Sequence, residues 1–167
     1  MPVPKRLLAL DVRTSKLGFA VFEGPTSLLD WGVRSFEKSS KALTFSVSER
    51  LRVLFAFYEP SAIVIRSRNY HLQCHRHTQA KIMAIIKSES RAQSKKLMVV
   101  TAKQVRHAFA KYGATHKHDI ALRVTDQFQE LAWKLPLRRK PYQSELTAML
   151  VFDAAANGMT YFRRQIH

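Results

Sequence analysis

Two aspartates stand where an unpaired carboxylate would be costly. Asp11 follows the apolar run "LLAL" near the start of the chain, and Asp153 lies in the apolar helical stretch "AMLVFDAAANGMTYF" near its end. A strand-tip aspartate can simply cap a turn through its own backbone. On a closely packed helix face, however, an unpaired carboxylate costs several kcal/mol, so Asp153 predicts a partner that is a cation or a metal ion.

A third acid, Glu145, precedes Asp153 by eight residues. If one helix runs from Ser144 onward, the two carboxylates lie about 12 Å apart along its axis. They can then share a site only if Glu145 lies in the preceding loop and folds back. The alternative interpretation is a favourable charge at a helix N-terminus, with Ser144 as its cap.

The elements that must position these acids follow from hydrophobic periodicity. Short apolar or β-rich runs predict five strands, at residues 7–12, 17–22, 28–33, 62–65 and 97–100. Helical spacing and turn signals predict five helices, at residues 41–57, 78–90, 102–111, 117–131 and 144–162. This order indicates a single α/β domain over residues 1–167, a mixed sheet with helices on its faces.

Charge is the strongest compositional signal. The chain carries 28 Lys and Arg against 12 Asp and Glu, a formal net charge of +16, which indicates a polyanionic partner. Between residues 66 and 118 the only acid is Glu89, among twelve Lys and Arg and six His. A membrane surface is the weaker alternative, since no helix in this stretch has a wide apolar face left over after core packing.

Other classes of protein and site find little support. The single cysteine, Cys74, excludes an internal disulfide, and no apolar run approaches the length of a membrane span. With no signal-like start, the sequence predicts a cytoplasmic protein. The stretch "YHLQCHRH" contains Tyr70, His71, Cys74, His75 and His77 and could suggest zinc, but no second cluster completes a tetrahedral set. Surface histidines that contact phosphate are the favoured interpretation.

Three motifs carry a resemblance to a known family. They are "LALDVRTSKLGFAVFEG", "PSAIVI" and "VFDAAANG", joined by "GATHKH" at residues 113–118 and by the segment from Arg139-Lys140-Pro141 to Asp153. In this order the chain resembles the RuvC-like branch of the RNase H-like superfamily, the Holliday junction resolvases, over nearly its whole length. The resemblance implies an RNase H-like five-stranded mixed sheet with helices on both faces.

The resemblance also implies an activity. Asp11 and Asp153 take the places of metal ligands, and Asp11, Asp153 and Glu145 are the candidate catalytic residues of a structure-specific DNA endonuclease. Two Mg²⁺ or Mn²⁺ ions would activate water against a phosphodiester. The implied partner is branched DNA, and resolvases of this type work as homodimers.

One position departs from the family pattern. Where the family has a glutamate at the end of the fourth strand, the sequence "AIVIRSR" has Arg66. An arginine there would repel a metal ion or take its place by pairing with Asp11 and Asp153. Two hypotheses follow: an active metal-dependent nuclease, or a catalytically inactive protein of this fold that binds branched or duplex nucleic acid.

Basic residues beside the expected site are candidate phosphate contacts. They lie in the first turn, after the fourth strand, at a helix start and in the loop before the last helix: Arg13, Lys16, Arg66, Arg68, Lys117, Arg138, Arg139 and Lys140. Tyr70 and Tyr142 are candidates for stacking on bases.

Overall fold

A five-stranded mixed sheet forms the centre of the molecule. The computed structural model describes residues 5–166 apart from 38, 40 and 71. The strands are β1 (Arg6–Val12), β2 (Lys16–Glu23), β3 (Leu28–Ser35), β4 (Ala62–Arg66) and β5 (Lys96–Val100), in the order β3-β2-β1-β4-β5. β1, β2 and β3 form an antiparallel meander, whereas β4 pairs parallel to both β1 and β5. This sheet confirms the predicted α/β architecture.

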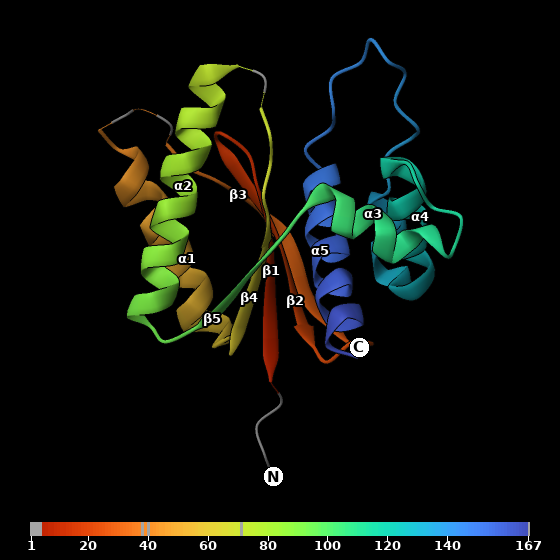
Figure 1. Ribbon diagram of the computed structural model, residues 1–167, viewed down its shortest axis with the longest axis horizontal. Helices are drawn as coiled ribbons and strands as arrows, with labels where there is room; N and C mark the ends of the chain where they lie inside the picture. The colour runs from red at the N-terminus through yellow and green to blue at the C-terminus, as the bar shows by residue number, and fades with distance from the viewer. Residues whose placement is uncertain (1–4, 38, 40, 71, 167) are drawn as a thin grey trace.

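Helices cover both faces of the sheet (Figure 1). α1 (Leu43–Tyr58) and α2 (Gln73–Ala92) lie on one face, and α3 (Ala102–Ala110), α4 (Lys117–Gln127) and α5 (Met149–Gln165) lie on the other. A 3₁₀ helix at Gln129–Lys134 follows α4.

β1 is buried on both sides, and its side chains alternate between the two cores. Leu8 and Leu10 belong to the core under α1 and α2, whereas Leu7 and Ala9 belong to the core under α5. Because successive strand residues point to opposite faces, Asp11 continues the second set and faces α5. The alternation of one strand therefore decides which helix meets the carboxylate.

α5 packs unusually close to the sheet. Its residues from Met149 to Thr160 are all buried, and its small side chains permit this approach. A Cβ atom at Gly18 of β2 would overlap the backbone carbonyl of Leu150. Asn157 Nδ2 donates a hydrogen bond of 2.9 Å to the carbonyl oxygen of Leu10. These contacts fix α5 against β1 and β2 next to Asp11, because Gly18 pairs with Asp11 across the sheet and Leu10 precedes it in β1.

The predicted start of the last helix is wrong. α5 begins at Met149, not at residue 144, because the N–H groups of Met149 and Leu150 bond to the carbonyls of Leu146 and Thr147 in tight turns. Ser144 therefore caps no helix. Glu145 lies in the loop before α5, so the interpretation of Glu145 as a helix N-terminal charge is also wrong.

Two other helices differ from prediction in length. α2 begins at Gln73, five residues earlier than predicted, so it includes most of the histidine-rich stretch. α4 ends at Gln127, because the chain leaves helical geometry at Phe128, which is 1% exposed within the core. Neither difference moves the residues at the end of β1.

The close contact between β2 and α5 generates a stability prediction. Gly18→Ala should lower the free energy of unfolding by about 3 kcal/mol, because the new methyl group forces the α5 backbone away from the sheet. Urea unfolding measures the change. Gly32→Ala is the matched control, since its methyl group would meet the side chains of Phe19 and Arg34 rather than a backbone, and it should cost clearly less. Equal losses in the two variants would contradict this account of how α5 is seated.

Candidate functional site

Two strand ends and the first turns of α5 bring the predicted acids together. Asp11 is the penultimate residue of β1, and Arg66 ends β4, which runs parallel beside it in the register Leu10–Ile65. Parallel strands end at the same edge of a sheet, so Asp11 and Arg66 are neighbours there. α5 adds Asp153. Asp11 and Asp153 are 0% and 4% exposed, so both carboxylates lie inside the protein.

Two arginines neutralise the aspartates. Arg66 Nη2 lies 3.3 Å from Asp11 Oδ1 and 3.6 Å from Asp153 Oδ2. Arg68 Nη2 donates a hydrogen bond to Asp11 Oδ2 and lies 3.4 Å from Asp153 Oδ2. Each guanidinium group therefore bridges both carboxylates. Of the two alternatives given for Arg66, pairing with Asp11 and Asp153 is the one that this geometry shows.

Glu145 joins the same group of charges from the loop. Arg13 Nη2 donates a hydrogen bond of 2.6 Å to Glu145 Oε2 and lies 3.9 Å from Asp153 Oδ2. Lys117, the first residue of α4, pairs with Glu145 and places its Nζ 2.8 Å from Asp153 Oδ2. Glu145 thus folds back from the loop onto the site, which is the condition under which it was expected to share a site with Asp153. We call these residues the ion-pair cluster: Asp11, Asp153, Glu145, Arg13, Arg66, Arg68 and Lys117.

The environment shifts the pKa values of several members. Burial raises the pKa of Asp153, and the nearby charge of Asp11 raises it further, against the opposing effects of Lys117 and Arg66. Burial also disfavours the charged form of Glu145, but its contacts with Lys117 and the charge of Arg13 outweigh this and lower its pKa. For Arg68, burial is outweighed by Asp11, and the pKa is raised. Asp11 and Asp153 thus depend on the cations around them.

The ion-pair cluster does not fit a two-metal centre. Mg²⁺ requires several oxygen ligands at about 2.0–2.1 Å, but a guanidinium group lies against each oxygen of Asp11. Arg68 Nη2 donates to Oδ2, and Arg66 Nη2 lies 3.3 Å from Oδ1, which accepts no hydrogen bond from any described residue. The cluster contains four cations and three carboxylates, a formal charge of +1 before any metal is added. Within residues 5–166, leaving aside the three that are not described, no group of three or more His, Cys, Asp or Glu residues could hold a metal ion.

An open cavity of about 810 Å³ adjoins the cluster. Lys117 and Glu145 form its inner wall, and the loop between the 3₁₀ helix and α5 forms its outer part. We call residues 135–148 the basic loop. It carries Arg138, Arg139 and Lys140, which extend the positive charge of the cluster outward.

The remaining predicted nucleic-acid contacts lie around this cavity or near it. Arg138 is 66% exposed and lies 3.9 Å from Asp119, whereas Arg139 Nη1 donates to the carbonyl oxygen of Gln143 within the loop. Lys140 Nζ lies 5.9 Å from the ring centroid of Tyr142, which is 79% exposed. Lys16 Nζ donates to Thr147 Oγ1 over 3.2 Å. Of the eight predicted contacts, only Arg13, Arg66, Arg68 and Lys117 pair with carboxylates of the cluster.

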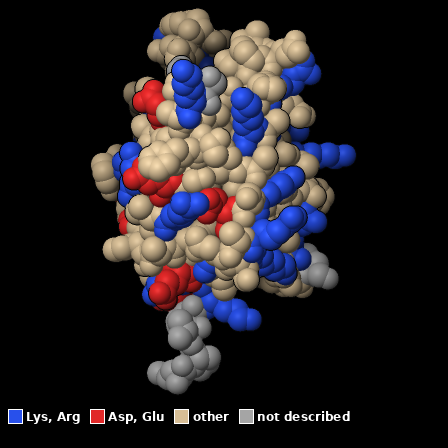
Figure 2. Space-filling view, turned by 90° about the vertical axis from the view of Figure 1, so that its left-hand side faces the viewer, with Lys and Arg blue, Asp and Glu red and all other residues tan. Residues whose placement is uncertain are grey.

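The histidine-rich stretch follows Arg68 of the cluster almost directly in the chain, and Tyr70, its first residue, lies near the charges of Arg68 and Asp11. Cys74, His75 and His77 are in the first turns of α2, and Tyr70 packs its ring against His75 with centroids 5.6 Å apart. His71 lies outside the described residues. Figure 2 shows the face that carries α1 and α2. Basic side chains gather along one side of this face, and the acidic side chains lie on the rest of it among residues of other kinds. Zinc binding by this stretch gains no support from the described residues.

Two features of the site escaped the sequence analysis. Arg68 was expected to contact phosphate, yet it neutralises Asp11; residues 66 and 68 of an extended chain share a face, and this spacing was the available signal. Asn157 anchors α5 to β1, and an amide one helical turn after Asp153 in an apolar run was the signal for it.

Comparison with solved structures identifies the fold. Thermus thermophilus RuvC in complex with Holliday junction substrate is 16% identical, with a TM-score of 0.72 over 97% of this chain and 96% of that one. The yeast mitochondrial Holliday junction resolvase Ydc2 is 12% identical, with a TM-score of 0.68 over 98% and 81%. Fowlpox virus resolvase, also with Holliday junction DNA, is 11% identical, with a TM-score of 0.56 over 95% and 99%. At such identities the likeness shows the fold, which is the RNase H-like fold of RuvC.

No known family and no curated protein matches the sequence. Across the described part of the chain, no helix is long and apolar enough to cross a membrane.

Neutralisation of Asp11 by Arg68 generates a second prediction. Arg68→Met should lower the free energy of unfolding by about 3 kcal/mol, because it leaves a buried carboxylate short of a partner. The double variant Asp11→Asn/Arg68→Met should be more stable than Arg68→Met alone. Urea unfolding at pH 7 measures both. Arg138→Met, at an exposed ion pair, is the control and should change stability by less than about 1 kcal/mol.

The lowered pKa of Glu145 generates a prediction of pH dependence. A carboxylate whose folded-state pKa is lowered stabilises the fold above its ordinary pKa, near 4.3, and loses this effect as the pH falls. Glu145→Gln should therefore cost about 1 kcal/mol at pH 7, and the cost should vanish toward pH 3. Unfolding of both proteins across this range measures it. Glu49→Gln, outside the ion-pair cluster, is the control; a cost for Glu145→Gln that is constant with pH would contradict the assignment.

Proposed function

We propose that this protein, which has the RNase H-like fold of RuvC, binds branched DNA at the ion-pair cluster and basic loop without metal-dependent cleavage. The fold and the convergence of Asp11, Asp153 and Glu145 agree with a resolvase-like ancestry. The arginines between the carboxylates favour binding over hydrolysis. This is the second of the two hypotheses that the sequence left open.

The observation that carries the proposal is the position of the Arg66 guanidinium. Arg66 Nη2 lies within 3.6 Å of a carboxylate oxygen of both Asp11 and Asp153. A cation that neutralises two buried carboxylates supplies the charge balance that metal ions would otherwise supply. The carboxylates are then structural.

Charge supports nucleic acid as the ligand. The formal net charge of +16 attracts phosphates, and Lys or Arg contacts with phosphates release counterions. Two of the structures with this fold contain Holliday junction DNA. The cavity beside the cluster is lined by Lys117, Arg138, Arg139 and Lys140, with Glu145 as its only acid. Its surface therefore suits a phosphate backbone.

The basic loop favours a branch point over a continuous duplex. Leu137 and Tyr142 are 94% and 79% exposed, next to the three adjacent cations of the loop. Exposed aromatic side chains stack on bases, and apolar ones such as leucine insert between them; bases are accessible to both where a duplex is interrupted. Lys and Arg beside them hold the backbone in either case, so the apolar contacts supply the preference for branched DNA.

The proposal predicts binding that needs no divalent metal. The protein should bind a four-way junction more tightly than a linear duplex of equal length in EDTA, as measured by fluorescence anisotropy. Mg²⁺ or Mn²⁺ should not raise the melting temperature beyond the effect of NaCl at matched ionic strength, because the cluster is already neutralised. The labelled junction should stay intact in either metal.

Variants locate the binding surface. Replacing Arg138, Arg139 and Lys140 by alanine should reduce the slope of log K against log salt by about 2.7 units, since each phosphate contact contributes about 0.9. Arg50→Ala on α1 is the control and should leave the slope unchanged. Specific cleavage that Asp11→Asn abolishes would replace the proposal with the nuclease hypothesis. Equal affinity for junction and duplex would refute the preference for branched DNA.

Stoichiometry remains a prediction of the resemblance. If two copies bind one junction, the complex contains twice the protein mass of a complex with a single copy. Sedimentation of the protein–junction complex would measure this mass.

A further inference from the structure

A second basic surface lies between α3 and the C-terminal half of α5. A groove of about 720 Å³ is lined by residues of both helices and of the turn before α4. Its charged and titratable residues are all basic: Lys103, Arg106, His107, Lys111, Arg163 and Arg164. We call this surface the α3–α5 groove. None of its residues belongs to the ion-pair cluster or to the basic loop.

Arg163 forms a fixed, half-buried floor of the groove. Its guanidinium group stacks over the rings of Phe109 and Tyr112, at 4.4 Å and 4.8 Å, and donates a hydrogen bond of 2.7 Å to the carbonyl oxygen of Ala108. Burial lowers its pKa. Among the described residues, no carboxylate lies within ion-pair distance of Arg163. A positioned cation of this kind favours an anionic ligand.

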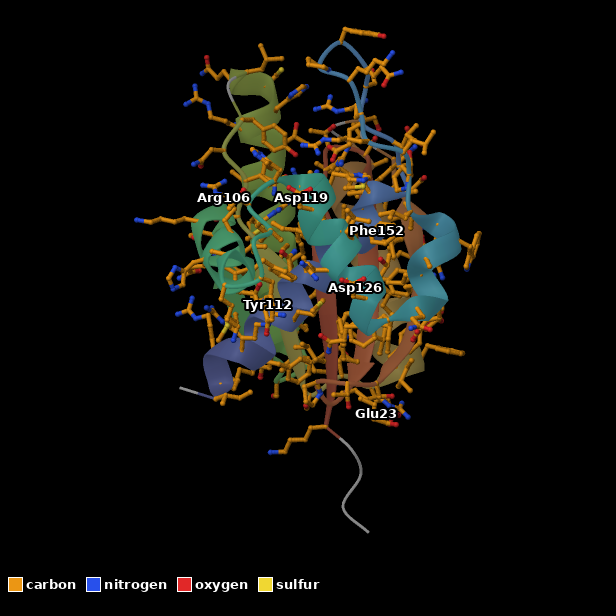
Figure 3. The ribbon with its side chains drawn as sticks, turned by 90° about the vertical axis from the view of Figure 1, so that its right-hand side faces the viewer. Glu23, Arg106, Tyr112, Asp119, Asp126 and Phe152 are labelled. Carbon is orange, nitrogen blue, oxygen red and sulfur yellow. The ribbon has the colours of Figure 1, made fainter. Side chains whose placement is uncertain are left out.

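The acidic residues of this face lie elsewhere. Figure 3 shows Arg106 and Tyr112 on the α3 side, whereas Asp119 and Asp126 lie on α4. Asp126 pairs with Arg123 of its own helix, and Asp119 lies 3.9 Å from Arg138 of the basic loop. The groove therefore keeps its positive charge, and the hydrocarbon stems of its Lys and Arg residues cover its apolar walls.

α5 connects the groove to the ion-pair cluster. Asp153 and Arg163 are ten residues apart on this helix, which separates the two sites by about 15 Å along its axis. This length corresponds to about four to five base pairs of B-form DNA. α5 itself is buried over most of this length, so a duplex arm that starts at the cluster and runs over the outer surface, parallel to the α5 axis, would bring its phosphates to the groove.

We propose that the α3–α5 groove binds the phosphate backbone of a duplex arm whose branch point lies at the ion-pair cluster. The inference rests on the proposed function and extends it, because it assigns a second, separate contact to the DNA. Lys103 of α3 and Lys111, the residue that follows this helix, are both exposed and hold the phosphates, and Arg163 supports them from the floor.

The test compares two double variants with the same change in charge. Lys103→Glu/Lys111→Glu alters the groove, and Lys81→Glu/Lys87→Glu alters the exposed surface of α2 on the opposite face of the sheet. The first should weaken junction binding about tenfold more than the second at 0.1 M salt, and reduce the salt slope by about 1.8 units. Melting temperatures of both variants show that they remain folded.

Arm length provides an independent measurement. On a junction whose arms are closed by hairpin loops after three base pairs, the phosphates no longer reach the groove, and the two double variants should bind equally. On long arms, equal binding by the two variants would overturn the inference while the proposed function stands, since net charge alone would explain it. If the wild-type protein binds neither junction nor duplex, the proposed function fails, and the groove's assignment to a DNA arm fails with it.

Discussion

Neutralisation of two buried carboxylates is the constraint on which this structure depends. Asp11 and Asp153 share an interior site, and an isolated ionised carboxylate there would cost several kcal/mol. The chain meets this requirement with side chains from three places: the end of β4, the turn after β1 and the start of α4. The same cations lie where a metal ion would have to bind the aspartates, so one electrostatic requirement bears both on the stability of this region and on the function proposed for it.

The ion-pair cluster depends on close packing of the backbone around it. α5 brings Asp153 to Asp11 only because Gly18 allows its first turn to touch β2 and because Asn157 bonds to the carbonyl of Leu10. Neither contact involves a charge. The charged residues then adapt: Arg13, Lys117 and Glu145 extend from two turns and a helix start, where long side chains retain freedom of approach. A rigid apolar frame with an adjustable charged layer explains how four cations can converge on three acids.

Hydrophobic alternation and apolar runs are local signals, and they predicted the strands and the sheet class. The meeting of Asp11 with Asp153 was implied by the resemblance to RuvC-like proteins. The resemblance also identified Arg66 as the residue that departs from the pattern. Sequence reasoning placed the start of α5 incorrectly: the N–H groups of Met149 and Leu150 bond to Leu146 and Thr147 in tight turns, and Glu145 folds back to pair with Lys117 and Arg13, tertiary contacts that no local propensity encodes. The role of Arg68 was missed for a related reason: a basic residue after a strand contacts solvent, phosphate or an interior acid, and only the packing of α5 distinguishes these outcomes.

The density of cations around Asp11 bears on how such a centre changes over evolution. Exchange of Arg66 for an acid would still leave Arg13, Arg68 and Lys117 beside the carboxylates. A single substitution at Arg66 would therefore leave the carboxylates paired with cations rather than free to bind a divalent ion. Several further changes would be needed, and each intermediate protein would have less well balanced charges in its interior. With these arginines in place, the balance of charge in the interior opposes the acquisition of a metal-binding set of acids one substitution at a time.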